Sequence, residues 1–271
     1  MPAPDAMPGV PGGRFAQLPS SLQRLARTQR LGKDGVPALL AHPDWETPAP
    51  TVLWMHGRTV HKELDPGRYL RLVRAGIAVC AIDLPGHGER YEDELQLPDH
   101  TLRVVEQGVR EVDGVLAALQ DPAFGGVFDA SRLGIGGMSA GGMVTLRRLG
   151  DEHPFVCAAV ESTAGDFSHM PRYFERYEPA FIEAMNPIAH VSGWRPIPLL
   201  ALHSEADEWV PVEAIRSLVA ALEGHYAGAA PLTLRTWPET GAPFEHAGFG
   251  RVANDAKNEQ VDFFRRSFGL A

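Results

Sequence analysis

Residues 133–146 read LGIGGMSAGGMVTL, and this stretch decides the fold. An apolar, glycine-rich run leads into Gly137-Met138-Ser139-Ala140-Gly141, and a helix-forming run follows. A serine on a sharp turn between a strand and a helix adopts a strained backbone conformation, so its neighbours two residues away must lack bulk. The turn also places Ser139 at the positive N-terminal end of the helix, where developing negative charge is stabilised. The pattern predicts a nucleophilic serine, although a glycine-rich turn without chemistry also fits these five residues.

A second signal lies upstream, where a predicted buried strand over residues 52–55 ends in His56-Gly57. In acyl transfer, a backbone N–H after such a strand joins the N–H of the residue after the nucleophile in holding the oxyanion. The predicted donors are therefore the N–H group of Ala140 and that of Arg58, with Thr59 as the alternative to Arg58. His56 precedes the serine, which is the wrong order for a base. We interpret it as a structural side chain that supports the loop.

In a catalytic triad with the chain order serine, acid, histidine, the acid is expected downstream of the serine. A strand predicted over residues 198–203 leads into a loop that places Asp207 beyond the carboxyl end of the strand. Glu205 and Glu208 lie on the same loop and compete for the role. The run Val210-Pro211 then opens a helix at the spacing expected after an acid loop, which favours Asp207.

The base is expected on the loop between the last predicted strand and the C-terminal helix. His246 lies there, whereas His225 precedes that strand and so lies in the wrong loop. In the resulting mechanism His246 takes the proton of Ser139 during attack and returns it to the leaving group, while Asp207 orients the imidazole ring.

Short apolar runs alternate with helical patterns from residue 51 onward, which predicts βα units in a mainly parallel sheet. Residues 25–43 alternate enough to supply one or two further strands. We expect residues 1–20 to form a flexible arm and residues 21–271 to form one domain. The strands are expected over residues 52–55, 77–83, 133–136, 155–161, 198–203 and 232–237, and the helices over residues 68–74, 102–119, 140–149, 212–222 and 254–268.

Residues 162–195 interrupt the alternation because they follow a strand but are too long for a simple crossover. The segment carries several aromatic side chains. It predicts either a small helical cap inserted in the domain or an ordinary crossover helix with its aromatic face in the core, and periodicity does not separate the two. The cap hypothesis places Phe174 and Phe181 in the wall of the substrate pocket, with Thr59 and Trp209 as further pocket candidates.

Composition limits the classes of protein. Apolar residues make up 44% and charged residues 22% of the 271, as in a globular protein with a large core. The formal net charge of −9 and the lack of a basic patch argue against nucleic-acid or membrane partners. Cys80 and Cys157 lie in apolar runs and predict reduced core thiols, with no metal spacing and no implied cofactor. The N-terminus lacks the features of a signal peptide, so a cytoplasmic location is expected, and the oligomeric state stays open.

With these signals in order, residues 51–268 resemble the α/β-hydrolase superfamily. The run Pro85-Gly86-His87-Gly88 also resembles the turn after the fourth strand of that fold. The chain is most similar to small bacterial carboxylesterases related to dienelactone hydrolase and to the catalytic domain of prolyl oligopeptidase. The resemblance implies an α/β-hydrolase fold, with helices on both faces of the sheet. It also implies a serine hydrolase that cleaves a carboxylic ester of a small or medium substrate through an acyl-enzyme intermediate.

Two departures narrow this expectation. Dienelactone hydrolase uses a cysteine where this chain has Ser139, so its specific activity does not carry over. Prolyl oligopeptidases have a β-propeller ahead of the catalytic domain, and residues 1–50 are too short a stretch to form one, which makes size-gated peptide cleavage doubtful. The alternatives left open are thioester or amide hydrolysis by the same route, and a non-catalytic small-molecule binding member of the fold.

Overall fold

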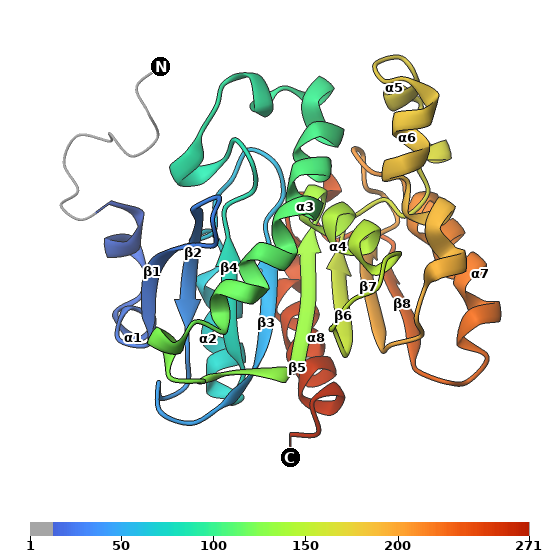
Figure 1. The fold of residues 1–271 in the computed structure, drawn as a ribbon. Helices are drawn as coiled ribbons and strands as arrows, with labels where there is room; N and C mark the ends of the chain where they lie inside the picture. The colour runs from blue at the N-terminus through green and yellow to red at the C-terminus, as the bar shows by residue number, and fades with distance from the viewer. Residues whose placement is uncertain (1–12, 271) are drawn as a thin grey trace.

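Eight strands form one sheet in the computed structural model of the chain, which describes residues 13–270 (Figure 1). Their order across the sheet is β1-β2-β4-β3-β5-β6-β7-β8. The first two strands pair antiparallel, as do β2 and β4, and every other pair is parallel, which confirms the predicted mainly parallel sheet. The strands are β1 Ala26–Leu31, β2 Val36–Ala41, β3 Ala49–Met55, β4 Ala78–Ile82, β5 Phe128–Met138, β6 Cys157–Glu161, β7 Leu199–Ser204 and β8 Leu232–Trp237.

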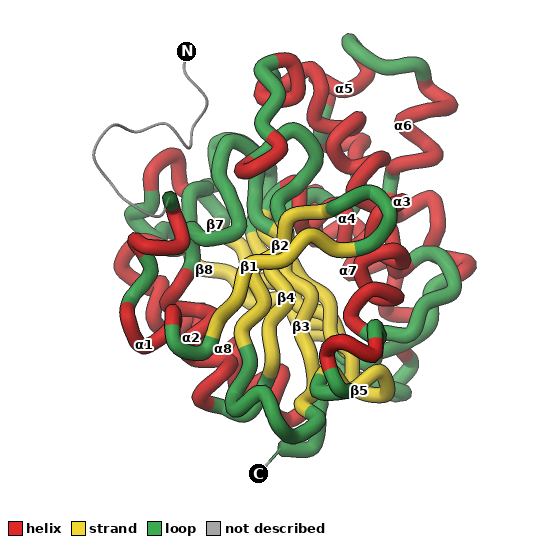
Figure 2. The backbone as a smooth tube through the Cα atoms, turned by 60° about the vertical axis from the view of Figure 1, so that its left-hand side comes forward, coloured by secondary structure: helices red, strands yellow, loops and turns green. Residues whose placement is uncertain are grey.

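Helices cover both faces of the sheet, so strand residues of both parities are apolar. In β3, for example, Leu53 and Met55 enter one core cluster while Val52 and Trp54 enter the other. Figure 2 shows α1, α2 and α8 on one side of the sheet and α3, α4 and α7 on the other. The helices are α1 Ser20–Gln23, α2 Pro66–Arg74, α3 Thr101–Leu119, α4 Ala140–Leu149, α5 Pro171–Phe174, α6 Pro179–Met185, α7 Glu213–Tyr226 and α8 Ala253–Ser267.

The predicted elements from residue 51 onward are present, with shifted ends. The strand β5 begins at Phe128, ahead of residue 133, because Phe128 already pairs with Ala49 of β3; the register then shifts, and pairing resumes between Thr51 and Leu133. Residues 25–43 supply two strands. Of the predicted arm, residues 1–12 lie outside the described part of the chain. Residues 14–17 instead form a 3₁₀ helix, and Leu18 is buried in the core beside α1. No helix among the described residues is long and apolar enough to cross a membrane.

The segment 162–195 is helical but broken into short pieces, with α5 and α6 standing beyond the carboxyl end of the parallel strands (Figure 1). Its aromatic side chains do not form one surface. Phe167 and Tyr173 are fully buried in the core, which is the outcome expected of a crossover. Phe181 packs against Tyr177 in a tilted arrangement with ring centroids 5.5 Å apart, and the guanidinium of Arg103 lies over the Phe181 ring at 4.3 Å.

Phe174 points the other way and is 53% exposed. The expectation that Phe174 and Phe181 together wall a pocket is therefore wrong for Phe174, which faces solvent. The reason is local: Phe174 directly follows buried Tyr173 at the end of the four-residue helix α5, and adjacent helical positions face different directions.

We predict that alanine substitution destabilises the protein at Phe181 but not at Phe174. Phe181→Ala removes an aromatic side chain packed on α3 and should lower the free energy of unfolding by about 1–2 kcal/mol. Phe174→Ala is the matched control, because an exposed side chain away from special features changes stability by no more than about 0.5 kcal/mol. Urea denaturation of both variants is the measurement. Equal losses in the two variants would show that the packing of this segment is wrongly described.

Candidate active site

Ser139 lies between the last residue of β5 and the first residue of α4, with φ 53° and ψ −116°. This left-handed φ is costly for a residue with a Cβ and persists only where the surroundings enforce it. The enforcement comes from close backbone contacts on either side. A Cβ on Gly137 would lie 2.4 Å from the carbonyl carbon of Gly141, and a Cβ on Gly141 would lie 2.3 Å from the oxygen of Met55. Glycine is therefore required at both positions, for the reason the sequence motif suggested.

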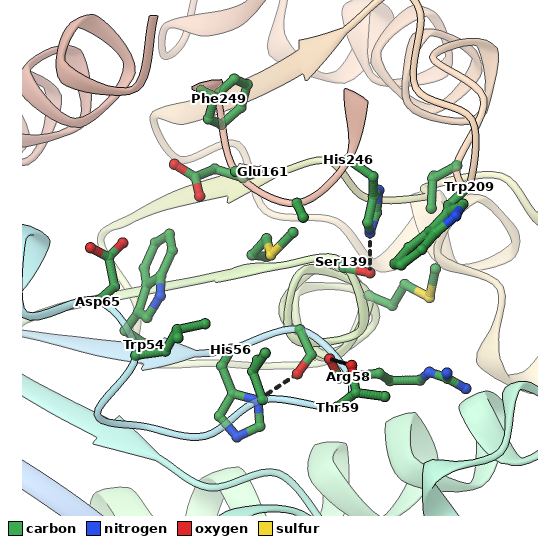
Figure 3. A pocket seen from close by; sticks show the side chains of 18 of the residues that line it. Trp54, His56, Arg58, Thr59, Asp65, Ser139, Glu161, Trp209, His246 and Phe249 are labelled. Carbon is green, nitrogen blue, oxygen red and sulfur yellow. Dashed lines mark hydrogen bonds between the residues drawn. The ribbon is translucent and has the colours of Figure 1, made fainter. Parts of the chain in front are cut away.

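A chain of hydrogen bonds leads away from the Ser139 hydroxyl, and Figure 3 shows its first bond, between Ser139 and His246. Nε2 of His246 lies 3.0 Å from Oγ of Ser139, and Nδ1 of His246 lies 2.8 Å from Oδ2 of Asp207. Since Nδ1 must carry a proton to donate to the carboxylate, neutral His246 has Nε2 free to accept the serine proton. The sequence placed these three residues on three different loops, and the fold brings them together.

Asp207 is held rigidly as an anion. Its Oδ1 accepts the backbone N–H groups of Trp209 and Val210 at 2.9 and 2.8 Å. Burial by itself would raise the pKa of Asp207, but hydrogen bonds from His203 and His246 outweigh burial and lower the pKa to about 2. The carboxylate is therefore ionised across the neutral pH range and stabilises a positive charge on the imidazole.

The competing acids and the competing histidine lie away from this chain. Glu205 is exposed and pairs with Arg216 at 2.8 Å. Glu208 is exposed on the same loop, and His225 is exposed near the end of α7. Of the candidates considered from the sequence, only Asp207 is buried and contacts His246.

The buried ring of His56 holds the loop that follows β3 through two hydrogen bonds. Its Nδ1 donates to the oxygen of Gly57 at 2.5 Å, and its Nε2 accepts the N–H of Leu84 at 3.0 Å. Burial lowers the pKa of His56 to about 4, so the ring is neutral and keeps this pair of bonds. Further along, the N–H of Lys62 donates to buried Asp83 at 2.8 Å. His56 thus has the structural role expected from the sequence, and it supports the loop that carries Arg58 and Thr59.

Ser139 opens into a cavity of about 540 Å³, large enough for a small organic substrate. Of the predicted pocket residues, Thr59 and Trp209 line this cavity, whereas Phe174 and Phe181 do not. The segment 162–195 instead contributes Arg172 and Tyr173. The other lining side chains that the sequence did not suggest include Trp54, Asp65, Arg68, Met138, Met143, Glu161, Phe249 and Lys257.

One group among these additions is a buried ion-pair network. Arg68 stacks over the ring of Trp54 at 4.0 Å and donates through Nη2 to both oxygens of Glu161 at 2.9 Å. Asp65 accepts from Nε of Arg68 at 3.0 Å and from Nζ of Lys257 at 2.7 Å. The signal available in the sequence was Glu161, a charged residue that ends an otherwise apolar strand.

Comparison with known proteins agrees with this geometry. The sequence pattern described as the prolyl oligopeptidase family matches residues 68–271. The chain belongs to this family. It is therefore a serine hydrolase of the α/β-hydrolase fold, as the resemblance implied.

Individual relatives are similar over most of the chain. Esterase YjfP of Escherichia coli K12 is 27% identical over 251 residues, which are 85% of this chain and 95% of that protein. The structure of TT1662 from Thermus thermophilus superimposes with a TM-score of 0.70 at 22% identity and covers 91% of this chain and 99% of its own. A puromycin-hydrolyzing peptidase of Mycobacterium tuberculosis gives a TM-score of 0.68 at 24% identity, with 91% of this chain matching 40% of that one.

The glycine contacts at Ser139 give a stability prediction. Gly141→Ala forces a Cβ against the backbone of β3, which cannot move aside, and should lower the free energy of unfolding by about 3 kcal/mol. Gly114→Ala is the matched control: this position in α3 has no atom within 4 Å of the added Cβ, so higher helix propensity should raise stability by about 1 kcal/mol. Thermal or urea unfolding compares them. A Gly141→Ala protein as stable as the wild type would refute the proposed role of the close backbone contact.

Proposed function

We propose that the protein hydrolyses a carboxylic ester of a small or medium substrate through an acyl-enzyme intermediate on Ser139. The observation that carries this proposal is the hydrogen-bonded series of Ser139, His246 and Asp207 beside a cavity of about 540 Å³. Similarity to an esterase over nearly the full length of that relative supports the choice of an ester.

In the proposed reaction, Oγ of Ser139 attacks the ester carbonyl carbon while Nε2 of His246 takes the hydroxyl proton. Asp207 keeps the ring oriented and stabilises the imidazolium. The carbonyl oxygen becomes an oxyanion, which the N–H groups of Arg58 and Ala140 are proposed to hold. Collapse of the tetrahedral intermediate breaks the bond to the alcohol oxygen, and His246 returns its proton to that leaving group.

Deacylation repeats these steps with water. His246 takes a proton from the attacking water, hydroxide adds to the acyl carbon, and the second tetrahedral intermediate releases the carboxylic acid. Ser139 Oγ leaves with the proton that His246 returns, so the enzyme is regenerated without a net change. Every proton passes through Nε2 of His246, which therefore has to lie close to both Ser139 and the leaving group.

Amide hydrolysis is the second candidate, and membership of the prolyl oligopeptidase family favours it. The same acyl-enzyme route serves both substrates, so the site geometry does not separate them. Comparing p-nitrophenyl esters of increasing acyl length with aminoacyl p-nitroanilides separates them directly. Thioester cleavage, a binding role without turnover and the cytoplasmic location expected from the sequence stay predictions.

We predict that Ser139→Ala, His246→Ala and Asp207→Asn each lower kcat for p-nitrophenyl esters by about 10⁴-fold, the scale seen when members of such a triad are removed. KM should change far less, because all three side chains act mainly on the chemical step and not on substrate binding. Glu205→Gln is the matched control for the acid and should keep nearly full kcat. If Glu205→Gln is the damaging change and Asp207→Asn is mild, the acid is wrongly assigned; if folded wild-type protein cleaves no ester, the proposed function is wrong.

A further inference from the structure

The cavity beside Ser139 carries an excess of positive charge. Its lining contains four cationic side chains and two carboxylates, so with neutral histidines it holds a net charge of two positive units. The whole chain has a formal net charge of −9. The net charge of the cavity lining is therefore opposite in sign to the net charge of the whole chain. The cationic residues are Arg58, Arg68, Arg172 and Lys257, and the acidic residues are Asp65 and Glu161.

The charges are balanced at one end of the cavity. Arg68 pairs with Asp65 and Glu161 at 3.0 and 2.9 Å, and Lys257 pairs with Asp65 at 2.7 Å. In Figure 3 this end lies to the left, where Asp65 and Glu161 are drawn with Trp54. A charged substrate gains little from groups that are already neutralised by partners.

The opposite end holds the two remaining cations. In Figure 3 the guanidinium of Arg58 extends to the right, on the side of Trp209, with Ser139 between it and the balanced end. Among the described residues, Arg58 makes no ion pair, and its side-chain hydrogen bond goes to the neutral hydroxyl of Thr101 at 3.0 Å. Arg172 also makes no ion pair there and contacts the ring of Tyr173 at 5.5 Å.

Arg58 is half-buried, so the lack of a carboxylate partner leaves its positive charge only partly compensated by solvent. Burial lowers the pKa of the Arg58 guanidinium, and the positive charge of Arg172 also lowers it. Asp99, the acidic residue whose charge favours ionised Arg58, is itself paired with Arg176 at 2.9 Å. A half-buried cation next to a second cation is destabilised until an anion joins them.

We propose that Arg58 and Arg172 form a subsite that binds a carboxylate group of the substrate, so that the preferred substrates are anionic esters. The inference rests on the proposed ester hydrolysis and names its substrate class. Guanidinium groups suit this ligand because their N–H donors match the two oxygens of a carboxylate. The carboxylate of the bound substrate lies toward Trp209, and its ester group lies at Ser139.

The test compares matched pairs of esters that differ in one charge. The acyl arm uses the p-nitrophenyl monoester of adipic acid and its methyl-capped diester. The leaving-group arm uses 4-carboxyphenyl butyrate and its methyl ester. The measured quantity is the ratio of kcat/KM for the anionic and the capped ester in each pair, because this ratio cancels effects of a substitution on the chemical step.

Wild-type enzyme should prefer the anionic ester in one of the two arms, and the arm identifies the side of the scissile bond that carries the carboxylate. Arg172→Met should lower that ratio by about fivefold, the contribution of one partly exposed charge pair. Arg58→Met should lower it by about tenfold, since this cation is more buried. Raising the salt concentration should lower the wild-type ratio as well. Arg110→Met is the matched control: it removes the same charge from an exposed site on α3 and should keep the wild-type ratio.

A capped ester cleaved at least as well as the anionic ester in both arms, or ratios unchanged in Arg58→Met and Arg172→Met, would overturn the subsite while leaving ester hydrolysis in place. Calorimetric binding of the adipic monoester to Ser139→Ala protein gives a readout independent of turnover. Tighter binding of the monoester than of the diester, weakened by a second Arg172→Met change, supports the subsite even if the reaction proposed here is wrong. Equal binding of the two adipic esters, together with equal binding of 4-carboxyphenyl butyrate and its methyl ester, contradicts it.

Discussion

The site depends on the close approach of two backbone segments, the turn at Ser139 and the end of β3. Gly141 lies against the oxygen of Met55, and no side chain fits between them. Beside this contact Ser139 has a left-handed φ, and its hydroxyl lies 3.0 Å from Nε2 of His246. Gly141 also lies against the backbone oxygen of His56, which a Cβ would approach to 2.6 Å. The turn that carries Ser139 therefore depends on this packing constraint, and a side chain at Gly141 would disturb it.

Features of the structure that depend on contacts between neighbouring residues, or on the order of the strands, could be predicted from the sequence. The turn at Ser139 was predictable because close backbone contacts within the turn and with the adjacent strand β3 require its glycines. Asp207 and His246 were predictable from strand order, since the carboxyl ends of parallel strands meet at one edge of the sheet. The distance of 2.8 Å between Nδ1 of His246 and Oδ2 of Asp207 agrees with that reasoning.

The pocket walls were less predictable, and the reason is again physical. In a segment made of four- and seven-residue helices, a one-residue difference decides which way a side chain points. Tyr173 is buried against the core and lines the cavity, while neighbouring Phe174 faces solvent. Arg172 reaches the cavity from the same short helix. Hydrophobicity alone favoured the phenylalanines, yet the tertiary path of the chain selected the residues beside them.

The most direct test of the central claim, that the fold activates Ser139 as the nucleophile, is covalent labelling with a fluorophosphonate followed by peptide mass mapping. Such a reagent reacts with a serine that is activated by a neighbouring base. The expected result is one adduct, on Ser139, that is absent from Ser139→Ala protein. An adduct on another residue, or labelling that survives in Ser139→Ala, would contradict the assignment.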